Sequence, residues 1–230
     1  MTPAGPASPR RIRVWDLPTR LFHWLLLACV VGSLVSVNLG GNAVGWHFRF
    51  GYAILTLLLF RLLWGFVGPR YARFASFPPS PAAAIAWMRG ARAAWPGHNP
   101  VGAFSVYAML AALALQAVTG LFATDDIMWD GPLKAQVSNA TSALLTRVHK
   151  VNRFGVLALI ALPLVAIAWY GSVRKEPLVR AMIDGDKAVA TVAGEPSPEP
   201  AADGARERVL ALALLGLSAV AVWAIVKRLA

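Results

Sequence analysis

The chain has 230 residues, of which 57% are hydrophobic and 14% are charged, whereas an ordinary soluble domain carries about 25% charged residues. Its net charge of +11 does not indicate nucleic-acid binding, because the cations are divided among the loops between apolar stretches rather than gathered on one soluble face. The single cysteine, Cys29, excludes a disulfide framework, a cysteine-ligated cluster and a haem attached covalently through C-x-x-C-H.

Five continuously apolar stretches run along the chain, and each is close to the ~20 residues that cross a ~30 Å hydrocarbon layer as a helix. They are residues 21–38, 46–68, 101–123, 152–171 and 208–226. None alternates with a period of two, and an open strand edge is not tolerated in lipid. The sequence therefore predicts an all-α integral membrane protein with five transmembrane helices.

The polar segments between these stretches are short. Residues 1–11 are expected to be a disordered N-terminus, and the first apolar stretch is expected to be retained because no A-x-A-like cleavage site follows it. Residues 69–100 are rich in proline, alanine and arginine, and a short interfacial helix is predicted around 82–95. Residues 188–206 are predicted to be a flexible linker to a C-terminal transmembrane helix over 207–230.

The charges in the loops predict the orientation in the membrane. One set of connections is cationic, with Arg10, Arg11, Arg13 and Arg20, then Arg70, Arg73, Arg89 and Arg92, then Arg174, Lys175 and Arg180. The connection between the third and fourth stretches is acidic instead, with Asp125, Asp126 and Asp130 against Lys134. The positive-inside rule then predicts a multi-pass protein with a cytoplasmic N-terminus, although Lys227 and Arg228 on the outer side oppose the rule.

The chain has four histidines, and the predicted topology assigns each to one side of the membrane. His47 and His149 open the second and fourth stretches, which both enter from the outer face, so they are expected at matched depth. His23 and His98 are expected at the inner level. Two neutral imidazoles at one depth on different helices are the ligands that a bis-histidine haem requires.

Residues near the histidine pair favour the same interpretation. Gly51 follows His47 by one helical turn and would leave room for a porphyrin edge, and Gly120 would leave more. Arg49 and Arg153 lie near the same level and could pair with haem propionates. A single histidine at the end of a span more often binds nothing, but a matched pair with H-x-x-x-G favours haem.

Fourteen residues make about four helical turns, or ~21 Å, so a residue fourteen positions further along faces nearly the same way at the opposite level. Fourteen residues after His149 stands Pro163, which cannot bind iron. Fourteen residues after His47 stands Arg61, which could hold propionates or extend to the inner interface.

Several stretches resemble the bacterial cytochrome b561 family, close to the b-type cytochrome subunit of nickel–iron hydrogenases. They are VWDLPTRLFHW, HFRFGYAILTLLLFRLLWGFVGPRYARF, GHNPVGAFSVYAMLAALALQAVTGLFATDD, LTRVHKVNRFG and LVRAMIDGDK, within residues 12–187. The resemblance implies a four-helix haem-binding transmembrane bundle over 12–187, here followed by a fifth C-terminal transmembrane helix.

In that family the haem ligands are one histidine in each of the first two helices and two in the fourth. His23, His47 and His149 match this pattern as iron ligands, whereas the fourth position falls on Pro163. Three alternatives stay open: one haem b held by His47 and His149, a second five-coordinate haem on His23, or a replacement ligand such as His98.

The resemblance implies electron transfer in a respiratory chain, between the quinone pool and a partner such as a periplasmic cytochrome c or a hydrogenase. The protein would then be an electron-transfer subunit in the lipid bilayer of the bacterial inner (cytoplasmic) membrane that binds haem b and uses quinone. The alternative is a haem-poor or haem-free membrane anchor that docks a redox partner. An ion-coupled transporter is disfavoured because the predicted spans contain no carboxylate.

Overall fold

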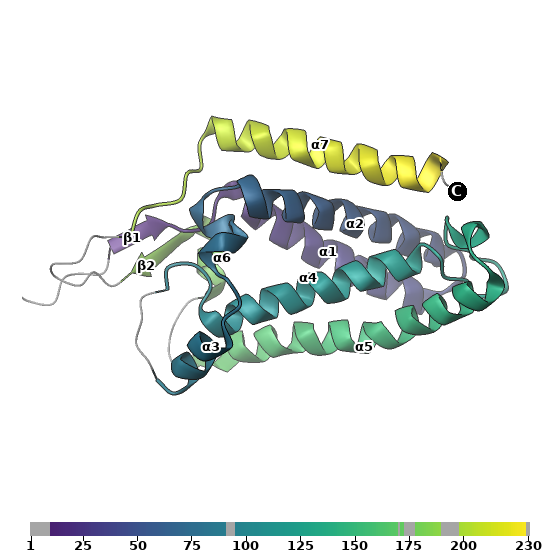
Figure 1. Cartoon of the computed structure of the whole chain (residues 1–230), viewed down its shortest axis with the longest axis horizontal. Helices are drawn as coiled ribbons and strands as arrows, with labels where there is room; N and C mark the ends of the chain where they lie inside the picture. The colour runs from purple at the N-terminus through teal and green to yellow at the C-terminus, as the bar shows by residue number, and fades with distance from the viewer. Residues whose placement is uncertain (1–9, 91–94, 170, 173–177, 190–197, 229–230) are drawn as a thin grey trace, which may run out of the picture.

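A computed structural model describes residues 10–90, 95–169, 171–172, 178–189 and 198–228 (Figure 1). The long helices are α1 (Leu17–Leu39), α2 (Val44–Val67), α4 (Pro100–Gly120), α5 (Asn139–Trp169) and α7 (Ala205–Arg228). The short elements are β1 (Arg10–Arg13), α3 (Pro81–Met88), α6 (Leu178–Asp184), β2 (Asp186–Val189) and the 3-10 turns η1 (Gly41–Ala43), η2 (Arg70–Ala72), η3 (Phe74–Ser76) and η4 (Lys134–Gln136). All five long helices are long and apolar enough to cross a membrane, which confirms the predicted multi-pass helical protein.

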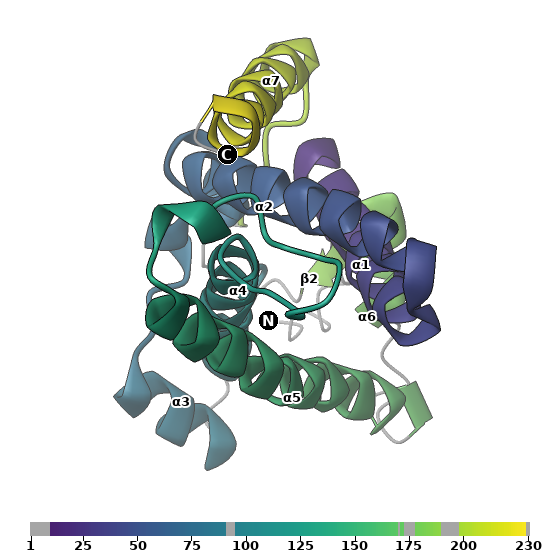
Figure 2. The same ribbon diagram turned by 90° about the vertical axis from the view of Figure 1, so that its right-hand side faces the viewer.

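The helices α1, α2, α4 and α5 form a bundle, and α7 packs on its outside against α2 (Figure 2). Within the bundle α1 lies against α2, α2 against α4, and α4 against α5. One end of the bundle carries β1, β2, α3 and α6 and is called the sheet end (Figure 1). The opposite end carries the α4–α5 connection, with His47 near the start of α2, and is called the histidine end.

Polar side chains define where several helices begin. Asp16 caps α1 by accepting the backbone N–H of Thr19 at 2.9 Å, and Trp64 of α2 donates its indole N–H to the same carboxylate oxygen at 3.1 Å. Asn99 caps α4 by accepting the N–H of Gly102, with a proline as the first helical residue. The predicted interfacial helix around 82–95 is α3, and residues 91–94 lie outside the described ranges.

Helix α5 begins at Asn139, thirteen residues before the predicted span at 152–171. His149 therefore does not open this helix but lies almost three turns inside it. The early turns are held by polar contacts: the Ser142 hydroxyl donates to the carbonyl of Phe122 at 2.7 Å, and the Thr146 hydroxyl accepts the N–H of Thr124 at 3.1 Å. Hydropathy marks only the part of a helix that lies in lipid, so polar opening turns are not included in a span predicted this way.

The bundle has a thin apolar core and an apolar exterior. Its central cluster, which draws one or more residues from each of the four bundle helices, consists of Val30, Ile54, Leu58, Leu113 and Val156. Many other large apolar side chains are exposed, among them Leu157, Leu162 and Val165 of α5. An exterior of this kind is expected where lipid covers the helices, because lipid replaces water as the surrounding solvent.

A two-stranded antiparallel sheet at the sheet end was not predicted. Arg10 pairs with Val189 and Arg13 with Asp186, so the sheet joins the segment before α1 to the segment after α6. The predicted disordered N-terminus and flexible linker fall largely on residues 1–9 and 190–197, which lie outside the described ranges. The described parts of both segments are packed: Arg10 and Arg11 belong to β1, and the N–H of the buried Ala201 donates to the carbonyl of Arg13 at 2.8 Å.

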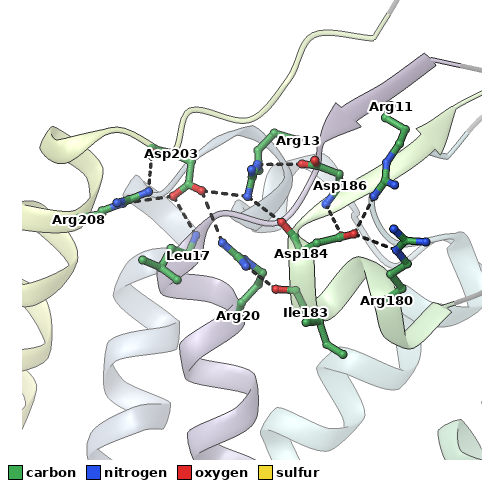
Figure 3. A network of polar contacts seen from close by, with 10 residues as sticks. All are labelled: Arg11, Arg13, Leu17, Arg20, Arg180, Ile183, Asp184, Asp186, Asp203 and Arg208. Carbon is green, nitrogen blue, oxygen red and sulfur yellow. Dashed lines mark hydrogen bonds and ion pairs between the residues drawn. The ribbon is translucent and has the colours of Figure 1, made fainter.

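Ion pairs beside the sheet connect the N-terminal segment with α6 and with the segment before α7 (Figure 3). Asp203, just before α7, accepts the N–H of Leu17 at 3.0 Å and pairs with Arg13 at 3.3 Å and Arg208 at 3.7 Å. Asp184 pairs in the same region with Arg11 at 2.7 Å. The first turn of α7 is thus tied to the first turn of α1. Composition predicted a flexible linker for the segment before α7. The ion pairs of Asp203 could not be predicted, because local sequence does not show which distant segments pair.

Candidate functional site

A cavity of about 670 Å³ lies at the histidine end, between α1, α2, α4, α5 and the α4–α5 connection. It lies within the range of about 300–1,000 Å³ that is usual for sites of small molecules and cofactors. Val30 and Ile54 contribute to its apolar wall, and both His47 and His149 line it. The structure therefore brings together the two histidines that the sequence predicts as a pair.

The two imidazole rings are neighbours in an edge-on arrangement, at a distance that suits one metal ion. Their centroids are 6.1 Å apart and their planes are nearly perpendicular, at 87°. A nitrogen–metal distance of ~2 Å on each side of one ion puts two imidazole centroids about 6 Å apart. The described residues contain no group of three or more histidine, cysteine or carboxylate side chains that could hold a metal ion. The pair is therefore suited to a metal whose other ligands come from a macrocycle.

Hydrogen bonds determine which nitrogen of each ring is available. Nδ1 of His47 lies 3.0 Å from the carbonyl oxygen of Ser33, and Nδ1 of His149 lies 2.9 Å from the carbonyl oxygen of Gln116. A carbonyl oxygen only accepts, so Nδ1 carries the proton in both rings and Nε2 keeps its lone pair. Metal-binding histidines in proteins are commonly held in this tautomer by such a second hydrogen bond. The residues present therefore fit a bis-histidine haem.

The two predicted glycines play different parts. A Cβ added at Gly51 would meet no atom within 4 Å, and Gly51 lines the cavity, so it leaves open space as the sequence suggested. A Cβ added at Gly120 would lie 3.0 Å from Cε1 and 3.2 Å from Nδ1 of His149. Gly120 therefore makes room for the imidazole ring of His149 itself, in addition to lining the cavity.

The predicted cations separate into three positions. Arg153 lines the cavity, as does Lys150 beside it on α5, so both can reach an anionic group bound there. Arg49 is exposed and its guanidinium lies over the ring of Trp46 at 4.5 Å, outside the lining of the cavity. Arg61 lies at the sheet end, 3% exposed, with its guanidinium over the ring of Phe74 at 4.8 Å. The structure thus buries Arg61 instead of extending it to the interface.

The α4–α5 connection closes one side of the cavity, which the sequence did not predict. The Asp125 carboxylate accepts the backbone N–H groups of Ile127, Met128 and Trp129 at 2.8–3.0 Å. These bonds hold the pKa of Asp125 below its ordinary value, because they stabilise the charged form. The turn directs Trp129 against the ring of Phe48, at a centroid distance of 5.9 Å, and Trp129 lines the cavity.

Polar residues within the membrane spans hold the two histidines in position by hydrogen bonds, and the sequence did not predict these residues. Gln116 and Ser33 supply the two carbonyl groups, and the Gln116 side chain donates to the carbonyl of His149 at 3.1 Å. The Asn152 amide donates to the Gln116 side chain at 2.7 Å. Polar side chains are few in apolar spans and are usually buried for a purpose, so this rarity was the signal that could have found them.

The remaining predicted residues lie toward the sheet end. His23 is exposed on the second turn of α1 and does not line the cavity described above. Helix α5 continues through Pro163. His98 lies between the rings of Trp15 and Phe77, at 4.7 and 4.4 Å. Burial, with the nearby charges of Arg61 and Lys187, lowers the pKa of His98 to about 3, so its ring is neutral.

Comparison with known proteins agrees with this geometry. The family described as prokaryotic cytochrome b561 matches residues 14–185, about three quarters of the chain. Two curated relatives, both named "Probable Ni/Fe-hydrogenase 1 B-type cytochrome subunit", come from Escherichia coli strain K12 and Escherichia coli O157:H7. Each is 25% identical over 137 residues, which cover 46% of this chain and 57% of the relative. The chain thus spans little more than half the length of the curated relatives it matches.

Proposed function

Because this chain belongs to the prokaryotic cytochrome b561 family, we propose that it is a membrane electron-transfer subunit with one b haem between His47 and His149. The observation that carries the proposal is the pair of imidazole rings across the cavity, 6.1 Å apart, each with Nδ1 bound to a carbonyl. A b haem at this position supplies reversible one-electron chemistry at iron.

The protein's own groups have separate tasks at this site. His47 and His149 would hold the haem iron through Nε2, and the carbonyl groups of Ser33 and Gln116 keep both rings in that tautomer and orientation. Lys150 and Arg153 provide cations for the propionates. The apolar wall and Trp129 exclude water, which together with the ligand set determines the reduction potential.

We assign no ligand pair to the sheet end. In the proposal Pro163 occupies the position of the family's fourth ligand, and a proline ring offers no donor to iron. His98 is held between Trp15 and Phe77, so its imidazole already has a packing role. The proposal is therefore one haem per chain, with His23 left without a partner ligand.

The proposed orientation in the membrane rests on the charges of the loops, and the proposed redox partners rest on the family. Among the described residues, the cationic segments β1, α6 and the turn that follows α2 lie at the sheet end, so in this proposal the sheet end faces the cytoplasm and the histidine end faces outward. A haem held by His47 and His149 would then lie near the outer surface, within reach of a cytochrome c or a hydrogenase-type partner. The quinone pool in the bilayer would be the second redox partner of the same haem. The names of the curated relatives support a hydrogenase-type partner.

Haem content of purified variants tests the proposal. The pyridine haemochrome assay on the wild type should give one b haem per chain. His47→Ala and His149→Ala should each lose most of it, whereas His23→Ala, the matched control in the same bundle, should retain it. Two haems per chain, or loss of haem in His23→Ala alone, would contradict the one-haem assignment. A wild-type protein without a b-type spectrum would instead favour the haem-free anchor.

A further inference from the structure

A second cavity, of about 490 Å³, lies at the sheet end, away from the histidine pair. It is lined by residues that follow α2, including Arg70 and Arg73, and by the segment Trp95–His98 that precedes α4. Among the residues that the structure describes, two arginines and no carboxylate contribute to this lining. The cavity therefore has a positive character of its own.

Arg73 is available for a ligand. Its side chain is exposed, and among the described residues its guanidinium has neither an ion pair nor a hydrogen bond. Its backbone is fixed, because the Ser76 hydroxyl donates to the carbonyl of Arg73 at 2.7 Å. An arginine that is held in place but unpaired at a cavity is suited to bind a phosphate through two parallel N–H groups.

Arg70 has an anionic partner that can be displaced. Its guanidinium pairs with the carboxylate of Glu199, and the buried Tyr71 donates its hydroxyl proton to the backbone carbonyl of Glu199 at 2.7 Å. The side chains of Arg70 and Glu199 are 54% and 71% exposed, so the pair contributes little stability by itself. The Glu199 carboxylate thus occupies the place that another anion would take on Arg70.

The surroundings of the cavity are those of a membrane surface. Arg70 lies three residues after the end of α2, where Phe66 and Val67 are both exposed. Trp95, also partly exposed, borders the cavity, and its carbonyl accepts a hydrogen bond from Lys187 at 3.1 Å. Exposed aromatic and aliphatic side chains next to two cations are typical of the headgroup region of a bilayer.

We propose that this cavity binds a phosphate group through Arg70 and Arg73, as carried by the headgroup of an anionic phospholipid or by a free phosphate ion. In the lipid-bound form the acyl chains lie along the exposed end of α2. Glu199 acts as an internal competitor for Arg70, so its position regulates the affinity of the site. The proposal does not depend on haem binding at the opposite end of the bundle.

Lipid binding by the full chain in detergent tests the site, measured by native mass spectrometry with dioctanoyl phosphatidylglycerol. Arg73→Gln should weaken binding about five-fold or more, since one cation near a bilayer surface contributes on that order. Arg89→Gln is the matched control, because Arg89 is an exposed cation at the end of α3 that does not line the cavity. It should change binding less than two-fold.

Glu199→Gln provides the second arm, since it should increase affinity about three-fold or more by releasing Arg70. Damage to the fold does not produce such a gain. Added inorganic phosphate distinguishes the two sources: competition at millimolar concentration identifies a free-phosphate site, and its absence identifies a lipid site. Equal binding by Arg73→Gln, Arg89→Gln and wild type, or no gain in Glu199→Gln, would overturn the proposal.

Discussion

Replacing Gly120 with alanine tests how closely the structure packs against the His149 ring. The new Cβ would lie 3.0 Å from Cε1 and 3.2 Å from Nδ1 of His149. Ordinary contacts of this kind are about 3.5–4.0 Å, so the ring must move by a few tenths of an ångström. The Nδ1–Gln116 carbonyl bond, at 2.9 Å, is near its optimum and weakens with such a displacement.

The expected loss follows from that hydrogen bond. Disrupting a second hydrogen bond of a metal-binding histidine typically costs about 10- to 100-fold in metal affinity. We therefore expect Gly120→Ala to release haem about ten times faster than the wild type, with an altered reduced-minus-oxidised spectrum. Haem release can be followed by transfer to apomyoglobin, and the haem content of the purified protein by the pyridine haemochrome assay.

Gly155→Ala is the matched control for this substitution. Gly155 lies within α5, and the nearest atom to an added Cβ is the side-chain oxygen of Asn152 at 3.9 Å, an ordinary contact. This variant should retain haem as the wild type does. Wild-type haem release and spectrum in Gly120→Ala would refute the packing argument, and equal haem loss in both variants would show a general effect of changing a helical glycine.

Three further substitutions test other parts of the molecule. Burial holds the pKa of His98 at about 3 in the folded protein, whereas the ordinary value is 6.5. Between these two pH values the unfolded chain binds a proton that the folded protein does not bind. The free energy of unfolding should therefore fall as the pH drops from 6.5 toward 3, by at most about 1.4 kcal/mol per pH unit. The melting temperature in detergent at pH 7 and pH 5 measures this dependence. His98→Phe should reduce the difference in melting temperature between the two pH values. An unchanged difference in this variant would exclude His98 as the group that titrates. Asp16→Ala should destabilise the protein by about 1–3 kcal/mol, because α1 loses its cap and the buried indole of Trp64 loses its acceptor. Chemical denaturation checks it, with Asp16→Asn expected to recover part of the loss. Gly32→Ala should cost about 1–3 kcal/mol by overpacking, since its Cβ would come within 2.5 Å of the Phe50 ring, and a wild-type melting temperature would contradict the close α1–α2 contact.

The membrane spans and the placement of His47 and His149 at one end of the bundle could be predicted because both depend on local sequence. About 20 apolar residues suffice to span the hydrocarbon layer, so hydropathy alone located all five long helices. The connection between α1 and α2 is short, which places the start of α2 at the histidine end.

The extent of α5 and the packed segments at the sheet end could not be predicted in this way. The first turns of α5 are polar, and they are held by contacts with the end of α4 and the connection that follows it. Likewise β1 pairs with β2 across more than 170 residues, and Asp203 joins α7 to α1. Such contacts depend on which distant segments meet, and hydropathy and composition contain no information about this.

For the candidate site, the sequence alone determined that two histidines lie on separate apolar helices near one surface, because residue type and position along a helix are local properties. Only the tertiary structure decided that their rings are neighbours in one cavity, with Nδ1 of each bound to a carbonyl of a neighbouring helix. It also decided that Gly120 accommodates a ring, that Arg49 lies outside the cavity and that Arg61 is buried at the other end. These properties depend on the rotation and approach of the helices, which are set by packing between residues far apart in the chain.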